Sequence, residues 1–264
     1  MSDCSLAIFA CNRPYHFEKL LNSLKLNKNL EEFQIFFFLD FPKLQKDKSK
    51  YLKVVKIAEE FSTKAIIIKR EYNYGLKLNI LDGINYVLKK YEKVIVLEDD
   101  LLISENFLEY LKNALLYYKN YNEIISISGF GLSKQILKIA ENGEDFYLSY
   151  RFPSWGWATW RDKWPNDLLN YFKNIELKNK EKKQINLFCG NDVPRAIVKI
   201  MKNNLDAWAA LATYYSFVKN KYSLYPTSSF VENKGFDGSG VNGGYSKKIS
   251  SLRLSQNTKI KFIE

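Results

Sequence analysis

Three consecutive acidic residues, Glu98, Asp99 and Asp100, directly follow the apolar run VIVL at 94–97. Because side chains alternate along a strand, the three carboxylates cannot all point one way, and we expect a turn to begin there. Neighbouring carboxylates repel each other, and a hard divalent cation compensates their charge while leaving positions for water and substrate phosphates. The run therefore favours a Mg²⁺ or Mn²⁺ site. The alternative is an acidic turn before the next helix, whose N-terminus favours negative charge.

Two further apolar runs also end in polar residues. SLAIFAC at 5–11 is followed by Arg13, and QIFFFLD at 34–40 ends in Asp40. In a parallel sheet, ligands bind beyond the carboxyl ends of the strands. We therefore expect these residues and the three acids to lie on one rim.

The elements that position this rim alternate in type along the first half of the chain. Apolar runs of strand length alternate with segments of helical periodicity, which predicts βαβ units and a mostly parallel sheet covered on both faces. The expected strands are 5–11, 34–40, 65–69, 94–97 and 123–130, and the expected helices are 17–24, 50–61, 76–87 and 107–118, the last capped by Ser104.

The second half differs in composition, because all five tryptophans lie there. It contains PSWGWATWRDKW at 153–164, a lysine-rich segment at 173–183, a predicted helical stretch at about 192–219 and the glycine-rich NKGFDGSGVNGG at 233–244. The lysine-rich segment is typical of a solvated helix face or loop, and contact with a membrane surface is the alternative.

Composition narrows the class of protein. The chain has 264 residues, of which 16% are aromatic, and a net charge of +11, so it is long enough for a large α/β domain and unlike a disordered chain. A basic chain attracts nucleic acid, anionic membranes or phosphorylated small molecules, although an AT-rich genome alone also enriches lysine and asparagine. Three cysteines without metal-ligand spacing, and no apolar leader or span, predict a cytoplasmic protein or one peripheral on the inner membrane face.

VIVLEDDLLISENFLEYL resembles the acidic-motif segment of GT-A fold, nucleotide-sugar-dependent glycosyltransferases. The likeness is to the N-acetylglucosaminyltransferase I type branch, where the motif is also Glu-Asp-Asp. LAIFACNRP, IFFFLD, YNYGLKLNILDGINYVL, PSWGWATWRDKW and ENKGFDGSG follow in the order of that branch and of bacterial surface-glycan transferases.

The resemblance implies a GT-A (Rossmann-like) fold with a central sheet flanked by helices. Residues 1–130 would form the nucleotide-sugar-binding half, and 131–264 an aromatic-rich acceptor-binding and catalytic half of the same domain. It further implies an inverting, metal-dependent glycosyltransferase that uses a nucleotide diphosphate sugar, with UDP favoured. The acceptor would be a hydroxyl of a bacterial surface glycan or lipid-linked oligosaccharide.

The resemblance also assigns roles to residues. Asp100 would hold Mn²⁺ or Mg²⁺, Asp99 would support it, and Glu98 would face the ribose or donor sugar. Arg13 matches a phosphate-contacting arginine, and Asp40 matches a residue that accepts a hydrogen bond from the base; a surface arginine and a turn acid are the alternatives. The further residues expected to contact the nucleotide are Asn73, Lys77 and, in a flexible loop over the diphosphate, Gly235, Phe236 and Asp237.

An inverting transferase needs a general base for the acceptor hydroxyl. The family places it downstream of the tryptophan-rich stretch, where Asp206 fits best and Asp162 and Asp192 are rivals. Asp206 alternatively caps the helix expected from Ala207.

Tryptophan rings in the 153–164 stretch suit the apolar face of a sugar. Trp155 and Trp157 are therefore expected to line a sugar pocket, although tryptophans also build cores.

Two other activities remain as alternatives. A metal-dependent nucleotidyltransferase would use a similar sheet, but no glycine-rich basic loop follows the first strand. A basic nucleic-acid-binding protein would show a stripe of basic residues or a binding motif, whereas the lysines here are scattered.

Overall fold

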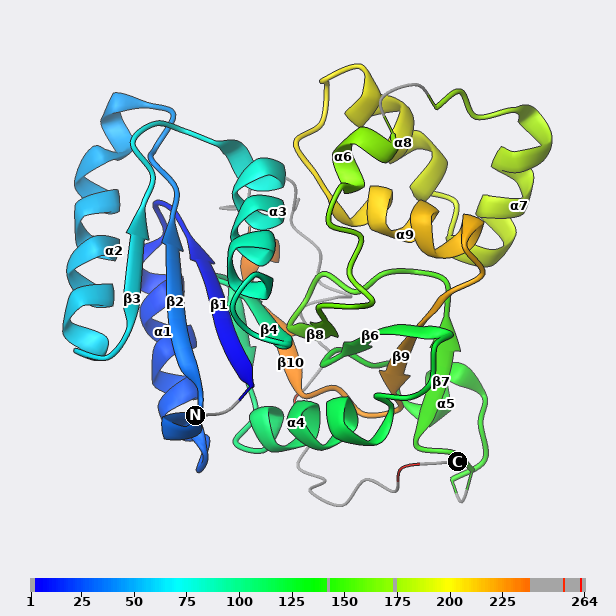
Figure 1. Ribbon diagram of the computed structural model, residues 1–264, viewed down its shortest axis with the longest axis horizontal. Coiled ribbons are helices and arrows are strands. Elements are labelled where there is room, and N and C mark those ends of the chain that lie inside the picture. Colours follow the sequence, from blue (N-terminus) through cyan, green and yellow to red (C-terminus); the bar gives the residue numbers. More distant parts are fainter. Residues whose placement is uncertain (1–2, 142, 173–174, 238–253, 255–261, 263–264) are drawn as a thin grey trace.

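The computed structural model describes residues 3–141, 143–172, 175–237, 254 and 262 (Figure 1). Its centre is an eight-stranded sheet of order β3-β2-β1-β4-β8-β6-β9-β7. The strands are β1 (Cys4–Ala10), β2 (Gln34–Leu39), β3 (Ile66–Lys69), β4 (Lys93–Glu98), β6 (Ile124–Ser128), β7 (Phe146–Ser149), β8 (Trp157–Trp160) and β9 (Tyr222–Pro226).

The first four strands of this sheet are parallel, as the alternation of strands and helices predicted. β1 pairs with both β2 and β4, and β2 pairs with β3. Every residue of β1 is buried, as are five of the six in β2, because helices cover both faces of the sheet. The mixed α/β class and the mostly parallel central sheet are confirmed.

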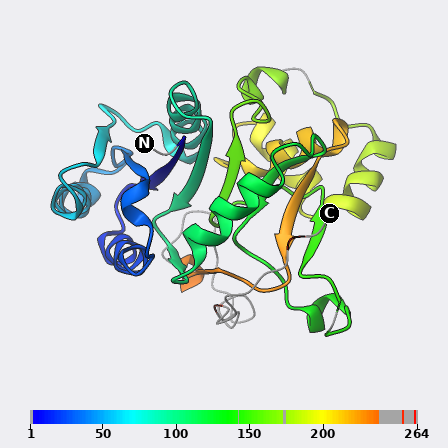
Figure 2. The same ribbon diagram turned by 60° about the horizontal axis from the view of Figure 1, so that its bottom comes forward.

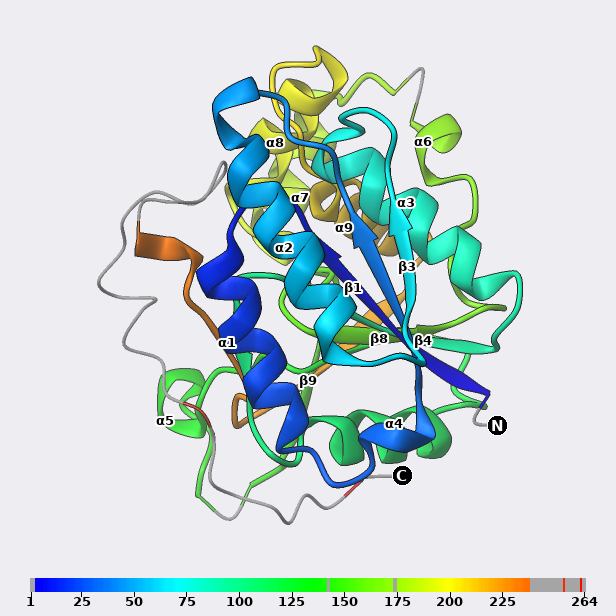
Figure 3. The same ribbon diagram turned by 90° about the vertical axis from the view of Figure 1, so that its left-hand side faces the viewer.

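Helices cover the two faces as separate layers (Figure 3). On one face, α1 (Pro14–Lys25), α2 (Lys48–Phe61) and α4 (Phe107–Tyr117) enclose one core cluster, and α4 packs beside β6 and β8 (Figure 2). On the other face, α3 (Gly75–Leu88), α7 (Asn179–Cys189), α8 (Val193–Met201) and α9 (Ala209–Val218) enclose a second cluster. The shorter elements are α5 (Lys134–Leu137), α6 (Leu168–Tyr171), η1 (Leu30–Glu32), η2 (Gln45–Asp47) and η3 (Gly235–Asp237).

The tryptophan-rich stretch lies in the middle of the sheet. Its strand β8 is antiparallel to both β4 and β6, so a strand from the second half of the chain separates two strands from the first. The halves expected at 1–130 and 131–264 therefore share one sheet.

A two-stranded ribbon extends from the end of β4. β5 (Leu101–Ile103) pairs antiparallel with β10 (Val231–Asn233), with Asn233 opposite Leu101. This pairing brings the glycine-rich segment back beside the acidic run.

Two predictions about helices are wrong. The stretch expected to be helical over about 192–219 is split into α8 and α9, because the chain leaves the helix at Lys202 and Asn203 takes a left-handed φ of 56°. Ser104 does not cap α4, which begins at Phe107 with no side-chain cap, and the Ser104 hydroxyl is buried without a hydrogen-bond partner among the described residues.

Candidate active site

The polar strand ends meet on one rim, as the sequence predicted. In the strand register Ala10 lies opposite Leu39, and Phe9 lies opposite Glu98. The residues that follow these strands, Arg13, Asp40 and Asp99, therefore leave the sheet at the same edge.

Arg13 forms ion pairs with two of the three acids. Its Nη1 lies 3.0 Å from Asp100 Oδ2, and its Nη2 contacts Asp99 Oδ1. The Asp99 side chain is 5% exposed, and burial raises its pKa while Arg13 acts in the opposite direction. The charge compensation that we expected from a metal is thus supplied in part by a guanidinium.

The second oxygen of Asp100 is the free position on this rim. Asp100 Oδ1 is buried and has no hydrogen-bond partner among the described residues. On the other side of the carboxylate, a Cβ on Gly235 would lie 2.1 Å from Oδ2, so only glycine lets the backbone approach this closely. An orphaned, buried carboxylate oxygen is a suitable ligand for a hard divalent cation, so the residues present fit the expected metal.

No larger cluster of metal ligands adds to Asp100. The described part of the chain contains no group of three or more His, Cys, Asp or Glu side chains arranged to hold a metal. Mg²⁺ is commonly held by one or two carboxylates together with substrate phosphates, so a single protein carboxylate suits a metal that arrives with a nucleotide.

Glu98 points away from Asp99, toward the second half of the chain. Its carboxylate accepts a hydrogen bond from Trp208, which precedes α9 and is 2% exposed. Burial, together with the charges of Asp100 and Asp99, raises the pKa of Glu98 to about 8. The three acids therefore do not all point one way, as expected.

Asp40 holds the loop that precedes α3. Its Oδ1 accepts the N–H of Tyr74 at 2.8 Å, and its Oδ2 accepts the N–H of Gly75 at 3.0 Å and the Asn73 amide at 3.1 Å. Burial raises the pKa of Asp40, and the two backbone hydrogen bonds partly offset that rise. Asp40 and Asn73, both expected to contact the nucleotide, thus lie together at the rim.

Asp206 binds the next two amides of the same loop. Its Oδ2 accepts the N–H of Leu76 at 2.6 Å, and its Oδ1 accepts the N–H of Lys77 at 2.9 Å. Asp206 therefore caps a helix, but it caps α3; the helix after it, α9, begins at Ala209 without a side-chain cap. Its role as general base stays a prediction.

The two rivals for the base lie elsewhere. Asp192 forms a bidentate ion pair with Arg151, in which Nη1 lies 2.8 Å from Oδ1 and Nη2 lies 2.7 Å from Oδ2. Asp162 is exposed in the turn after β8.

The segment 235–237 contacts three parts of the site. Gly235 lies against Asp100, Phe236 meets the ring of Trp155 edge to face at 5.5 Å, and Asp237 lies 3.1 Å from His16 Nε2. The rest of the glycine-rich segment, 238–244, lies outside the described residues.

Trp157 does not line a sugar pocket in this structure. It is fully buried, and its ring packs against Trp164, Trp208 and Phe152. The expectation that its ring binds a sugar is therefore wrong, because β8 lies in the middle of the sheet. Trp155 is partly buried beside Phe130 and Phe236, and keeps some exposed surface.

Three residues at the site were missed from the sequence. His16 contacts Asp237, Trp208 contacts Glu98, and Asn233 Oδ1 accepts the N–H of Gly235 at 2.7 Å. Of the three, His16 had the clearest signal in the sequence, because it lies three residues after Arg13, which the sequence predicted to be at the site.

Comparison with known proteins gives a family match. A family model described as the GNT-I family matches residues 3–197, which is most of the chain and includes Arg13, Asp40 and the Glu-Asp-Asp run. A search of curated proteins finds no significant match.

Solved structures with lower similarity also match. One is TarS 1-349 from S. aureus in complex with UDP-GlcNAc, with 19% identity, 49% of this chain and 34% of that chain covered, and a TM-score of 0.33. Another is the mannosyltransferase PcManGT from Pyrobaculum calidifontis in complex with GDP-Man and Mn²⁺, with 15% identity, 65% and 47% covered, and a TM-score of 0.41. The matched regions span about a third to a half of those chains.

Proposed function

This chain belongs to the GNT-I family, and we propose that it is a glycosyltransferase that moves a sugar from a nucleotide diphosphate sugar to an acceptor hydroxyl. The observation that carries the proposal is the family match over residues 3–197, which contains most of the polar rim at the ends of β1, β2 and β4. This match favours transfer of a sugar over nucleotidyl transfer or nucleic-acid binding.

The donor diphosphate would bind beside the paired Arg13 and Asp100. Arg13 provides a planar guanidinium suited to phosphate oxygens, and it already lies on this rim. Asp100 would hold Mn²⁺ or Mg²⁺ through its unpaired Oδ1. A cation bound there supplies Lewis-acid stabilisation of the departing diphosphate.

The nucleoside would lie toward Asp40 and Asn73, with a UDP-sugar as the proposed donor. Asp40 fixes the loop 73–75; its Oδ2 accepts two of these hydrogen bonds and its Oδ1 one, so Oδ1 is the oxygen that would accept the N–H of a uracil ring. Lys77 lies in the first turn of α3 in the same region, where its N–H is bound by Asp206.

Asp206 is the proposed base, and transfer with inversion is the proposed course. The N–H groups of Leu76 and Lys77 hold its carboxylate at the rim, and a carboxylate is a usual general base for the proton of an acceptor hydroxyl. Gly235, Phe236 and Asp237 would border the donor, because they lie against Asp100, Trp155 and His16.

The proposed acceptor is a bacterial surface glycan or a lipid-linked oligosaccharide, met in the cytoplasm or at the inner face of the membrane. A net charge of +11 attracts both an anionic donor and an anionic bilayer. In the described part of the chain no helix is both long and apolar enough to cross a bilayer.

Thermal stability with nucleotides tests the proposal. UDP together with Mn²⁺ should raise the melting temperature more than either alone, because a ligand that binds only the native state stabilises it. In Asp100→Asn, which keeps the shape but removes the charge, that joint shift and donor hydrolysis should both be lost. Glu60→Ala, at an exposed acid on α2, is the matched control. A wild-type protein that hydrolyses no nucleotide sugar and shows no joint shift would refute the proposal.

A further inference from the structure

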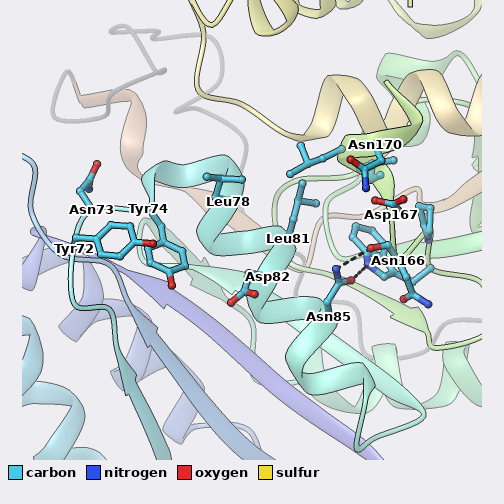
Figure 4. Close-up of a pocket in the computed structure, with 14 residues that line it drawn as sticks. Tyr72, Asn73, Tyr74, Leu78, Leu81, Asp82, Asn85, Asn166, Asp167 and Asn170 are labelled. Atoms are coloured by element: carbon cyan, nitrogen blue, oxygen red, sulfur yellow. Dashed lines mark hydrogen bonds between the residues drawn. The ribbon is translucent and has the colours of Figure 1, made fainter. Parts of the chain in front are cut away.

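A pocket of about 400 Å³ lies between α3 and the segment 164–170 (Figure 4). α3 contributes Leu78, Leu81, Asp82 and Asn85 to its wall, and the loop before α3 contributes Tyr72, Asn73 and Tyr74. Of the residues predicted to form the active site, only Asn73 lines this pocket. Its remaining lining residues have no role in the proposed donor site.

One end of the pocket carries an exposed aromatic platform. The Tyr72 ring is 64% exposed and lies 4.9 Å from the Tyr74 ring, centroid to centroid, at an interplanar angle of 33°. Exposed tyrosine faces suit the apolar face of a sugar ring, because they provide contact area with little loss of side-chain entropy.

Arg70 holds this platform in place from beneath. Its guanidinium carbon lies 4.4 Å from the Tyr74 ring centroid, and its Nη2 lies 2.7 Å from Asp82 Oδ2. The Arg70 side chain is 9% exposed, so it acts as a support and is itself shielded from a ligand. Arg70 therefore orients the Tyr74 ring and the Asp82 carboxylate.

The other end of the pocket carries polar side chains that are available for hydrogen bonds. Trp164 Nε1 donates to Asn85 Oδ1 at 2.9 Å, and Asn85 in turn donates to the backbone oxygen of Asn166 at 2.9 Å, which fixes the facing segment on α3. The exposed side chains of Asn166, Asp167 and Asn170 form no hydrogen bond with described residues.

The charge of the pocket selects the class of ligand. Its lining contains two aspartates and four asparagines but no lysine, arginine or histidine, in a chain whose net charge is +11. A phosphate or carboxylate on a ligand would find no cation among the lining residues and would face Asp167, whereas Asp82 is already paired with Arg70. A neutral, polyhydroxylated ligand instead finds both acceptors for its hydroxyl groups and donors from the asparagine amides.

We propose that this pocket binds a neutral oligosaccharide, as the remote part of the acceptor glycan whose reacting end lies at the rim. The inference rests on the proposed glycosyltransferase function. The pocket starts at the loop that Asp40 and Asp206 hold at the rim, and it follows α3 from Tyr74 to Asn85. Eleven residues of helix span about 16 Å, which is longer than one sugar ring.

Direct binding tests the inference without any need for turnover. Saturation-transfer NMR would be run with neutral oligosaccharides from monosaccharides to hexasaccharides, with sialylated and phosphorylated counterparts, and with UDP. We expect neutral chains to bind, and longer ones to bind more tightly than single sugars. Tyr72→Ala should weaken that binding roughly fivefold to tenfold, whereas Tyr72→Phe should retain it. Asp167→Ala provides a second variant at the opposite end of the pocket.

Phe188→Ala is the matched control, because Phe188 is 53% exposed on α7 and does not line the pocket. The inference is overturned if no neutral oligosaccharide in the series binds. It is also overturned if Tyr72→Ala and Asp167→Ala both leave binding unchanged, or if acidic saccharides or UDP bind these residues better. The joint thermal shift with UDP and Mn²⁺ reports separately on the donor site. If no saccharide binds but the joint thermal shift is present, only the inference that this pocket binds a saccharide is rejected. If saccharides bind but no donor is hydrolysed, only the proposed glycosyltransferase function is rejected.

Discussion

Asp40 and Asp206 together bind four successive backbone N–H groups at the start of α3. Asp40 takes those of Tyr74 and Gly75, and Asp206 takes those of Leu76 and Lys77. The first N–H groups of a helix have no partner within it, and the helix dipole favours negative charge there. Two carboxylates from distant parts of the chain thus fix α3 to the rim.

Replacement of Asp206 separates its capping role from its proposed catalytic role. In Asp206→Asn we expect a loss of about 1 kcal/mol in unfolding free energy, since one amide loses its acceptor. If Asp206 is the base, turnover falls by about 10² or more while donor binding persists. Chemical denaturation and steady-state kinetics measure the two effects.

Asp192→Asn is the matched control for this experiment, because Asp192 is the rival acid held by Arg151. Turnover of Asp206→Asn should be measured well below the melting temperature of this variant. If it stays near the wild-type value, Asp206 is a helix cap and not the general base. Loss of turnover in Asp192→Asn would move the base assignment there.

Removal of Arg13 should make the fold depend on divalent cations. Arg13→Ala leaves Asp99 and Asp100 without their shared counter-ion, and breaking such a partly buried pair typically costs about 3 kcal/mol. Because a cation can take the place of the guanidinium, Mn²⁺ alone should raise the melting temperature of Arg13→Ala more than that of the wild type. Differential scanning fluorimetry across a Mn²⁺ titration measures this difference.

Arg195→Ala, at an exposed arginine on α8, controls for the loss of one positive charge. Equal Mn²⁺ shifts in Arg13→Ala and the wild type would show that the acids at this rim do not take up the metal.

A methyl group at position 235 should disturb Asp100 without touching a charge. In Gly235→Ala the added Cβ would lie 2.1 Å from Asp100 Oδ2, so the backbone or the carboxylate must move. We expect binding of UDP in the presence of Mn²⁺ to weaken roughly tenfold or more. Isothermal titration calorimetry measures the affinity.

The neighbouring Lys234→Ala should bind UDP and Mn²⁺ almost as the wild type does, because among the described residues the Lys234 side chain pairs with Glu232 and not with Asp100. An unchanged affinity in Gly235→Ala would remove Asp100 from the metal site, since its carboxylate could not shift so far and still hold the ion.

Lys163 should make stability rise with pH. Its Nζ donates to the carbonyl oxygens of Tyr118 and Tyr121 at the end of α4, and burial lowers the pKa of Lys163 to about 8. An unfolded lysine titrates near 10.4, so above about pH 8 the native state loses its proton before the unfolded state does. The cost of burying the charge is fully present below pH 8 and declines as pH rises above it.

The difference in unfolding free energy between the wild type and Lys163→Met should therefore move in favour of the wild type between about pH 8 and pH 9.5. Urea denaturation at several pH values measures this difference, and Lys219→Met, at an exposed lysine after α9, is the control. A difference that stays flat over this range would mean that Lys163 titrates as an ordinary lysine.

Several features could be predicted from the sequence because their causes are local. The apolar runs of β1, β2 and β4 predicted strands covered on both faces, and the polar residue after each run predicted a shared rim. Parallel βαβ units place the carboxyl ends of their strands at one edge of the sheet. Arg13, Asp40 and the acidic run therefore meet there independently of how the second half of the chain folds. Alternation along a strand likewise predicted that the three acids cannot all point one way.

Other features depended on which segments meet across the fold. Asp206 lies 130 residues from Leu76, and no local pattern marks its capping contact with α3. Trp157 lies in a stretch that predicts a sugar pocket, but β8 runs inside the sheet and buries its ring. Gly235 reaches Asp100 through the pairing of β5 with β10. The sequence by itself determined the strands, their polar ends and the sign of the charge there, because hydrophobic periodicity acts over a few residues. Only the tertiary structure decided which distant side chains satisfy those ends, because the partners of a buried polar group depend on the path of the whole chain.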